Sequence, residues 1–231
     1  MNLACPIRAV TFDVGGTLIQ PWPSVGQVYA EVAGLHGYQA LDAEQLNRRF
    51  AAAWRQRSKF AYSRADWAAL VEQTFAGLGD SAHDKNLFEA LYRRFESPEA
   101  WRIYDDVLAT LTSLTRRGIK LAVVSNWDER LRPLLARLQL ERCFEAIVVS
   151  CEVGCAKPFP GIFEQAAQLL GVTPREVLHV GDSTEEDFNG AKRAGLHALL
   201  VNRQSTNPSR EEIRSLLEIE ARLAPPTAPA G

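Results

Sequence analysis

In the stretch "VTFDVGGTLIQ", residues 10–20, a short apolar run is followed by a single acid, Asp13, and then by two glycines and a threonine. Valine, threonine and phenylalanine favour an extended strand, and the two glycines favour a tight turn directly after it. Such a turn presents a carboxylate beside backbone amides that face an anion. The stretch therefore predicts a reactive carboxylate at the end of a buried strand.

Further apolar runs repeat this pattern along the chain. Short β-branched runs occupy residues 7–13, 119–126, 144–150, 176–182 and 197–202. From the second run onward they alternate with helical patterns, such as the one at 106–117 that ends before Gly118. Strands and helices that alternate at this length form a parallel sheet covered on both faces. We therefore predict an α/β fold whose core is a Rossmann-like, doubly wound parallel sheet.

The long segment between the first two runs has helical patterns and no strand signal. The helical patterns lie at residues 24–36, 42–57, 63–78 and 83–96. We expect an inserted all-helical cap domain at residues 21–100, with the Rossmann-like core formed by 1–20 and 101–221. Residues 222–231, which end in "APPTAPAG", have the composition of a disordered tail.

Composition and charge narrow the classes of function. The net charge is −2, from 26 basic and 28 acidic residues, so we expect no attraction to nucleic acid or to an anionic membrane surface. No apolar run approaches the roughly 20 residues of a membrane helix, and the first residues do not read as a signal peptide. The four cysteines form no paired CxxC pattern, which favours reduced thiols. We expect a cytoplasmic protein, and the sequence does not indicate its oligomeric state.

Polar residues follow four of the expected strands. Asp13 follows the first run, Ser125 and Asn126 end the second, Lys157 lies in the loop after the third, and Asp182 ends the fourth, with Asp187 soon after. In an open parallel sheet the carboxyl ends of the strands lie along one edge, where ligands bind. We therefore expect these residues to converge on one site although they lie far apart in the sequence.

Three acids of this set suit a hard metal ion. Asp13, Asp182 and Asp187 offer carboxylate oxygens, and Mg²⁺ takes few carboxylates while it keeps waters that a phosphate can replace. Three clustered acids also repel one another, and a nearby lysine relieves that repulsion. The pattern therefore predicts a Mg²⁺ site.

The remaining polar groups suit a phosphoryl group. Ser125 can donate a hydrogen bond to a phosphoryl oxygen, and Lys157 can neutralise its charge. The glycine-rich turn Gly15–Gly16–Thr17 supplies backbone donors, and we expect Gly16 and Thr17 to contact the phosphate. By composition this is a site for phosphoryl transfer, which needs positioning and charge stabilisation more than covalent chemistry.

Four motifs, "DVGGTL", "VVSN", "KPFPGIF" and "HVGDSTEEDFNGAKRAG", follow one another along the chain. In order and spacing they resemble the motifs of the haloacid dehalogenase-like hydrolase superfamily, in the branch with a helical cap between the first and second motifs (subfamily IA). The resemblance spans roughly residues 7–203. It implies that Asp13 is the nucleophile that forms an aspartyl-phosphate, and that Ser125 and Lys157 hold the phosphoryl group.

The resemblance also implies a metal site and a class of substrate. Asp182 and Asp187 would anchor Mg²⁺, and the backbone carbonyl of Gly15 would be a further ligand. Asn126 and Thr17 would lie at the edge of the site and position other groups. The implied substrate is a small-molecule phosphate ester.

One position departs from the pattern of the family. Its phosphatases carry DxDGT, in which the second acid protonates the leaving oxygen and later activates the hydrolytic water. Gly15 occupies that position here. The carbonyl that binds metal is kept, because every residue has one, but the general acid is missing, and such a group typically contributes ~10²–10⁴-fold.

Three functions are compatible with Gly15. The first is a Mg²⁺-dependent phosphatase that is slow, is limited to good leaving groups, or takes its proton from a cap residue or the substrate. The second is a haloacid dehalogenase, from which a halide leaves without a proton. The third is a non-catalytic protein that binds a phospholigand. The phosphatase is favoured over the dehalogenase because "GDSTEED" keeps a full acid cluster, whereas the dehalogenases of the family dispense with metal and carry an aromatic residue in place of Gly15.

Overall fold

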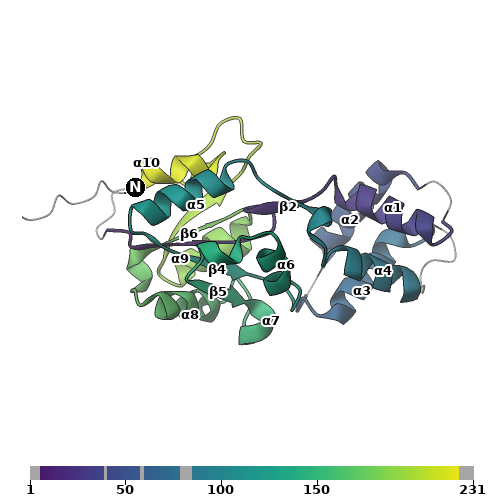
Figure 1. Cartoon of the computed structure of the whole chain (residues 1–231), viewed down its shortest axis with the longest axis horizontal. Coiled ribbons are helices and arrows are strands. Elements are labelled where there is room, and N and C mark those ends of the chain that lie inside the picture. Colours follow the sequence, from purple (N-terminus) through teal and green to yellow (C-terminus); the bar gives the residue numbers. More distant parts are fainter. Residues whose placement is uncertain (1–5, 39–40, 58–59, 79–84, 224–231) are drawn as a thin grey trace, which may run out of the picture. The chain divides into compact units, whose positions relative to one another are not determined.

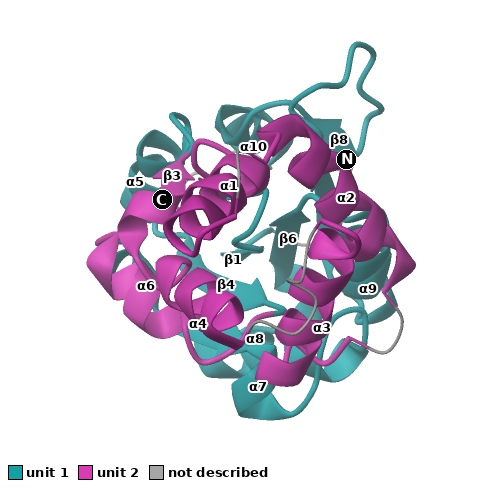
Figure 2. Ribbon diagram, turned by 90° about the vertical axis from the view of Figure 1, so that its right-hand side faces the viewer, with its two compact units in different colours: residues 1–18, 104–126, 140–231 teal, residues 19–103, 127–139 magenta. Residues whose placement is uncertain are grey.

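The computed structural model of the chain describes residues 6–38, 41–57, 60–78 and 85–223. It divides into two compact units (Figure 2). The first unit comprises residues 1–18, 104–126 and 140–231, and the second comprises residues 19–103 and 127–139. The range predicted for the cap, 21–100, lies within the second unit. Of the predicted tail, residues 224–231 lie outside the described residues.

The first unit is built on a six-stranded sheet with the order β5-β4-β1-β6-β7-β8. Its strands are β1 (Ala9–Phe12), β4 (Lys120–Ser125), β5 (Ala146–Val149), β6 (Val177–Gly181), β7 (His197–Val201) and β8 (Glu212–Ile213). All five neighbouring pairs are parallel. The strand order reverses on either side of β1, so the predicted α/β, doubly wound fold is confirmed. The short edge strand β8 was not predicted.

Helices cover both faces of this sheet. They are α5 (Val107–Arg116), α7 (Ser150–Val153), α8 (Pro160–Leu170), α9 (Gly190–Arg193) and α10 (Ile219–Arg222). Figure 1 shows α5 and α10 on one side of the sheet and α8 and α9 on the other. On the α8 side, Ile162 and Phe163 pack on alanines and valines of the central strands. The small side chains of the sheet allow the helix to approach closely, and burial of this apolar surface stabilises the unit.

The second unit is mainly helical. Its helices are α1 (Val25–Leu35), α2 (Ala43–Gln56), α3 (Arg64–Phe75), α4 (Lys85–Arg94) and α6 (Leu131–Arg137). Ser24 and Ser63 cap the first turns of α1 and α3, as their preference for helix N-termini leads us to expect. Tyr29, Phe75 and Leu91 pack in the common core of α1, α2, α3 and α4.

A short antiparallel pair in the second unit was also not predicted. Strands β2 (Ile19–Pro21) and β3 (Trp101–Ile103) pair in register. Each strand is too short to show a period of two, and Pro21 lacks the donor that a strand interior needs. Remaining short turns are η2 (Pro98–Ala100), η3 (Glu141–Cys143), η4 (Pro174–Glu176), η6 (Leu216–Glu218) and the π-helical turn η5 (Thr184–Asn189).

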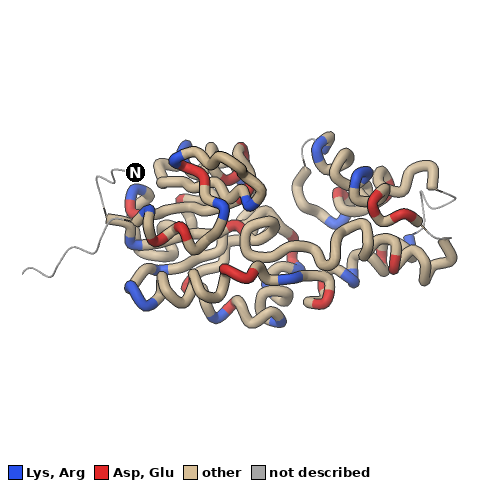
Figure 3. The backbone as a smooth tube through the Cα atoms, turned by 90° about the horizontal axis from the view of Figure 1, so that it is seen from above, with Lys and Arg blue, Asp and Glu red and all other residues tan. Residues whose placement is uncertain are grey.

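Charged residues are distributed over both units. Figure 3 shows Lys and Arg interspersed with Asp and Glu along the backbone of each unit, in keeping with the near-zero net charge. Among the described residues, no helix combines the length and the apolar character that crossing a membrane requires.

Candidate active site

Asp13 lies at the carboxyl end of β1, in the middle of the sheet. Its backbone N–H donates to the carbonyl of Val180 at 3.0 Å, so the pairing with β6 extends to this residue. The preceding residue, Phe12, pairs with Val123 of β4 and with Val180 of β6. This register places Ser125 on one side of Asp13 and Asp182 on the other. The predicted convergence at one edge of the sheet is therefore a consequence of strand register.

Two side chains donate to the same oxygen of Asp13. Ser125 Oγ lies 3.0 Å from Asp13 Oδ1, and Lys157 Nζ lies 2.6 Å from it. Lys157 Nζ also lies 2.6 Å from Oδ1 of Asp187. The lysine is only 4% exposed, so it acts as a buried cation shared by two carboxylates. Asp13, Ser125, Lys157 and Asp187 are thus brought together.

Asn126 holds the backbone of Lys157. Its Oδ1 accepts from the Lys157 N–H at 2.7 Å, and its Nδ2 donates to the Lys157 carbonyl at 2.9 Å. The same Nδ2 lies 3.2 Å from Oε2 of Glu186. The Asn126 amide therefore anchors the loop that carries the lysine.

The turn after Asp13 depends on Gly16. This glycine has φ +78°, a left-handed conformation, and a Cβ here would lie 2.2 Å from Oδ2 of Asp182. Gly15 is not among the glycines with positive φ. Thr17 is wholly buried, its Oγ1 has no partner among the described residues, and its carbonyl accepts from Arg203 Nη2 at 2.9 Å. Only glycine at position 16 allows Asp182 to lie against the turn.

Three carboxylates meet beside this turn. One oxygen each of Asp13, Asp182 and Asp187 lies within 4.8 Å of the others. A Cβ at Gly181 would lie 2.2 Å from Cγ of Asp187, so Gly181 leaves the space that this carboxylate fills. A set of carboxylate oxygens suits a hard divalent cation. The residues present therefore fit a metal ion, and Gly16 and Gly181 leave room for two of the carboxylates.

The titration of the acids reflects their crowding. Burial raises the pKa of Asp13 to about 6, with the charge of Asp187 adding to this effect and Lys157 opposing it. Burial and the charges of Asp13 and Asp187 raise the pKa of Asp182 to about 8. Asp182 is itself exposed, so solvent screens part of this effect. The cluster thus carries more negative charge than Lys157 offsets.

For Asp187 and Lys157, in contrast, the surroundings favour the charged form. Burial by itself raises the pKa of Asp187, but the charge of Lys157 and the hydrogen bond to His179 outweigh it and hold the pKa well below the usual range. Burial opposes the charged form of Lys157, yet the charges of Asp13 and Asp187 raise its pKa overall. Both groups therefore remain ionised across the physiological range.

A model of the haloacid dehalogenase-like hydrolase family matches residues 7–195. The chain belongs to this family. It is similar to haloacid dehalogenase-like hydrolase domain-containing protein 3 of Bos taurus, with 36% identity over 206 residues that cover 84% of this chain and 82% of the relative. A glyceraldehyde 3-phosphate phosphatase of Methanopyrus kandleri is 42% identical over 106 residues, 43% of each chain. The crystal structure of a HAD phosphatase from Thermococcus onnurineus shares the fold, with a TM-score of 0.65 and 27% identity over 94% of this chain and 97% of that one.

Sequence reasoning missed two residues that support the acid cluster of this hydrolase. His179 of β6 is wholly buried, with Nε2 3.1 Å from Asp187 Oδ1 and Nδ1 2.9 Å from Oγ1 of Thr11. Thr11 and His179 are register partners on β1 and β6. The available signal was a polar residue two or three positions before the acid that ends each of these apolar runs.

Arg203 is a third residue that sequence reasoning missed. Its guanidinium pairs with both carboxylate oxygens of Asp106, at 2.7 and 3.1 Å, while it also holds the carbonyl of Thr17. It lies 3.8 Å from the centre of the Tyr104 ring. Arg203 thereby connects the loop after β7 to the turn after β1. No local pattern in the sequence indicates this pairing.

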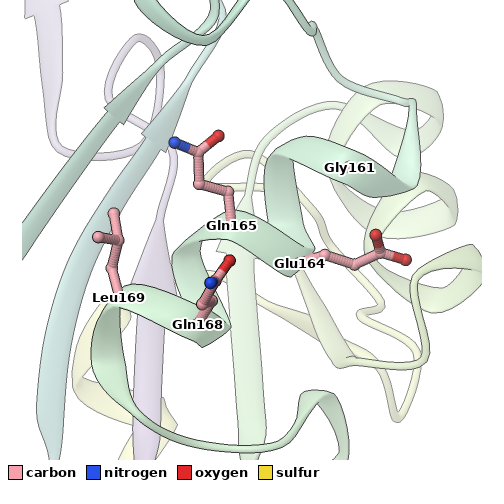
Figure 4. Close-up of a pocket in the computed structure, with 5 residues that line it drawn as sticks. All are labelled: Gly161, Glu164, Gln165, Gln168 and Leu169. Carbon is pink, nitrogen blue, oxygen red and sulfur yellow. The ribbon is translucent and has the colours of Figure 1, made fainter.

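An open hollow on the surface of α8 has a different character. It is lined by Gly161, Glu164, Gln165, Gln168 and Leu169, and its longer side chains project outward from one helix (Figure 4). These residues bring one carboxylate and no partner cation to the hollow. The hollow therefore lacks the group of acids with a shared lysine that lies at the edge of the sheet.

Proposed function

We propose that this chain is a Mg²⁺-dependent phosphatase that acts on a small-molecule phosphate ester through an aspartyl-phosphate on Asp13. One observation carries the proposal: Asp13 Oδ1 accepts from both Ser125 and Lys157, beside two further carboxylates within 4.8 Å. The phosphatase names of the relatives from Methanopyrus kandleri and Thermococcus onnurineus support the same class of reaction.

In this proposal Asp13 attacks phosphorus and the bond from phosphorus to the ester oxygen breaks. The side-chain donors engage Oδ1, so Oδ2 is the oxygen that forms the new bond. Ser125 donates a hydrogen bond to a phosphoryl oxygen, and Lys157 balances its charge. Water then attacks the aspartyl-phosphate, which releases phosphate and restores the Asp13 carboxylate.

Asp13, Asp182, Asp187 and the carbonyl of Gly15 would hold the metal ion. When bound, Mg²⁺ stabilises negative charge on the phosphoryl group as it is transferred. Asn126 keeps Lys157 in place through its backbone, at 2.7 and 2.9 Å. We assign Thr17 a similar supporting role in the turn.

Gly15 limits the substrates of the proposed enzyme. No carboxyl group stands at this position to protonate the departing oxygen. An alkoxide then leaves without assistance, whereas a nitrophenolate or an acyl-phosphate leaving group is stable enough to depart alone. The same glycine favours one alternative function, a protein that binds a phospholigand without turning it over.

Initial rates on a panel of phosphate esters, with Mg²⁺ and with EDTA, test the proposal. We expect turnover that needs Mg²⁺ and that Asp13→Asn abolishes, while the exposed Asp105→Asn serves as a matched control and retains it. Absence of turnover together with tight binding of beryllofluoride supports the phospholigand-binding alternative. Metal-independent release of halide from a 2-haloacid supports a dehalogenase instead.

A further inference from the structure

His179 lies in the middle of β6 and is sealed from solvent. Both ring nitrogens are engaged, Nδ1 by Thr11 Oγ1 at 2.9 Å and Nε2 by Asp187 Oδ1 at 3.1 Å. The ring of Phe163 packs edge-on against the imidazole, with centroids 5.0 Å apart. A buried polar side chain with two specific partners constrains the groups that it touches.

The partner of Nε2 determines whether that nitrogen carries a proton. Asp187 is ionised and can only accept, so Nε2 of His179 donates to it. Thr11 Oγ1, a hydroxyl that can donate or accept, faces Nδ1 at 2.9 Å. The contacts therefore run from Thr11 through His179 to Asp187.

The carboxylate of Asp187 is held on both oxygens. Oδ1 accepts hydrogen bonds from His179 Nε2 and Lys157 Nζ, and Oδ2 accepts one from the backbone N–H of Ser183 at 2.9 Å. Behind it, the absence of a side chain at Gly181 leaves room for this orientation. Removing one donor would leave the plane of the carboxylate less constrained.

We infer that His179 is a positioning residue for the proposed phosphoryl transfer, on which this inference rests. Its Nε2–H fixes the carboxylate of Asp187, which in turn shares Lys157 with Asp13 at 2.6 Å on each side. His179 reaches the reaction only through Asp187, in the way that hydrogen-bond partners orient the ligands of a metal site.

Three substitutions at one position separate this role from simple packing. In His179→Gln the carboxamide can reach the place of Nε2 and donate to Asp187. In His179→Asn the shorter amide can reach Thr11 but not Asp187, and His179→Leu offers neither contact. His197→Gln, on the neighbouring strand β7, is the matched control because this histidine is partly exposed and away from Asp187.

Affinity for Mg²⁺, measured by isothermal titration calorimetry, is the first readout. We expect a loss of about 10–100-fold in His179→Asn and His179→Leu, a smaller loss in His179→Gln, and none in His197→Gln. In turnover, kcat should fall in the same order with KM nearly unchanged. Equal Mg²⁺ affinities and equal kcat in all folded variants would overturn the inference, because a packing role predicts only a lower melting temperature.

The second readout does not depend on turnover. The chain has four histidines, so ¹⁵N-labelled imidazole spectra are simple, and loss of one set of signals in His179→Gln assigns His179. We expect a protonated Nε2, which faces the Asp187 carboxylate. An unprotonated Nε2 would overturn the inference even in an active enzyme. If the wild type lacks phosphatase activity, the proposed function fails, while the spectra and the Mg²⁺ titration still decide the role of His179.

Discussion

Each unit buries a cation against aspartate, but the two arrangements differ. In the second unit the guanidinium of Arg130 pairs with both oxygens of Asp128, at 2.9 and 2.5 Å, and lies 3.5 Å from the centre of the Tyr92 ring. In the first unit Lys157 is shared by Asp13 and Asp187, with Asp182 close by. One cation meets one anion in the second unit, whereas one cation faces three carboxylates in the first.

We expect this difference to separate a structural ion pair from the proposed reactive site. Arg130 has a planar fork that matches one carboxylate, and its Nη1 also donates to the carbonyl of Tyr92 at 3.1 Å. The opposite charges of Asp128 and Arg130 offset each other, and the guanidinium donates to both Asp128 and Tyr92. Lys157 is a point charge, and the acids around it keep an excess of negative charge that a further cation can neutralise. Excess negative charge at the edge of a sheet favours a bound cation.

The largest expected effect is on turnover. Asp13→Asn should reduce kcat on phosphate esters at least about 10³-fold, because an amide is not a competent nucleophile. Asp128→Asn should retain turnover at a temperature where the protein is folded. Steady-state kinetics on both variants makes the comparison. Activity that survives in Asp13→Asn would remove this residue from the mechanism and erase the contrast between the two aspartates.

For stability we expect the larger effect at Asp128 of the second unit. Asp128→Asn should destabilise the protein by about 3 kcal/mol, since it leaves the Arg130 charge buried without its partner. Replacing both residues, in Asp128→Leu with Arg130→Met, should recover most of this loss because no unpaired charge remains. Urea unfolding of the two variants and of the exposed control Asp105→Asn measures it. A loss no larger than that of the control would show that the pair is not structural.

A smaller effect is expected from a substitution at Gly15, which tests whether the proposed site lacks a general acid. Gly15→Asp should raise kcat/KM on alkyl phosphates by ~10²-fold and change that on nitrophenyl phosphate little. The left-handed position of the turn is Gly16, so we expect the backbone to accept Gly15→Asp. Gly16→Ala, in contrast, brings a Cβ to 2.2 Å from Asp182 and should abolish turnover. The measurement is kcat/KM for a series of phosphate esters, and the slope is that of log kcat/KM against the pKa of the leaving group. Parallel slopes for wild type and Gly15→Asp would mean that the proton comes from elsewhere.

The smallest effect is the pH dependence of stability. The pKa of Asp13 is raised to about 6 and that of Asp182 to about 8, so the folded protein binds more protons than the unfolded chain between their usual value of 3.8 and these values. In EDTA, stability should therefore fall as pH rises from about 5 to about 8, on the order of 2 kcal/mol after allowance for the exposure of Asp182.

Urea unfolding at several pH values checks this slope. Saturating Mg²⁺ should flatten it, because a bound cation favours the ionised carboxylates, and Asp182→Asn should weaken its upper part. Asp128→Asn should leave the slope in place, since that pair lies outside the cluster. A slope that is the same in EDTA and in Mg²⁺ would argue against a metal ion at these acids.

The sequence by itself determined five of the six strands of the sheet and the polar residues that follow them. Runs with a strong local signal, such as 7–13 and 176–182, became strands because burial on both faces selects β-branched residues wherever the strand lies. Parallel topology then places Asp13, Ser125 and Asp182 at one edge whatever the details of packing. The family follows from the same motifs. The roles assigned to the individual site residues stay predictions until the variants are measured.

Only the tertiary structure decided the contacts that support the site. β8 exists because Glu212 and Ile213 find partners on β7, and no period of two is visible in a two-residue strand. The bond from His179 to Asp187 and the bond from Arg203 to Thr17 depend on strand register and loop placement. Residues 127–139 lie in the second unit although they follow a strand of the first. Local periodicity reports which face a residue buries, whereas the choice of its partner depends on geometry that the whole chain assembles.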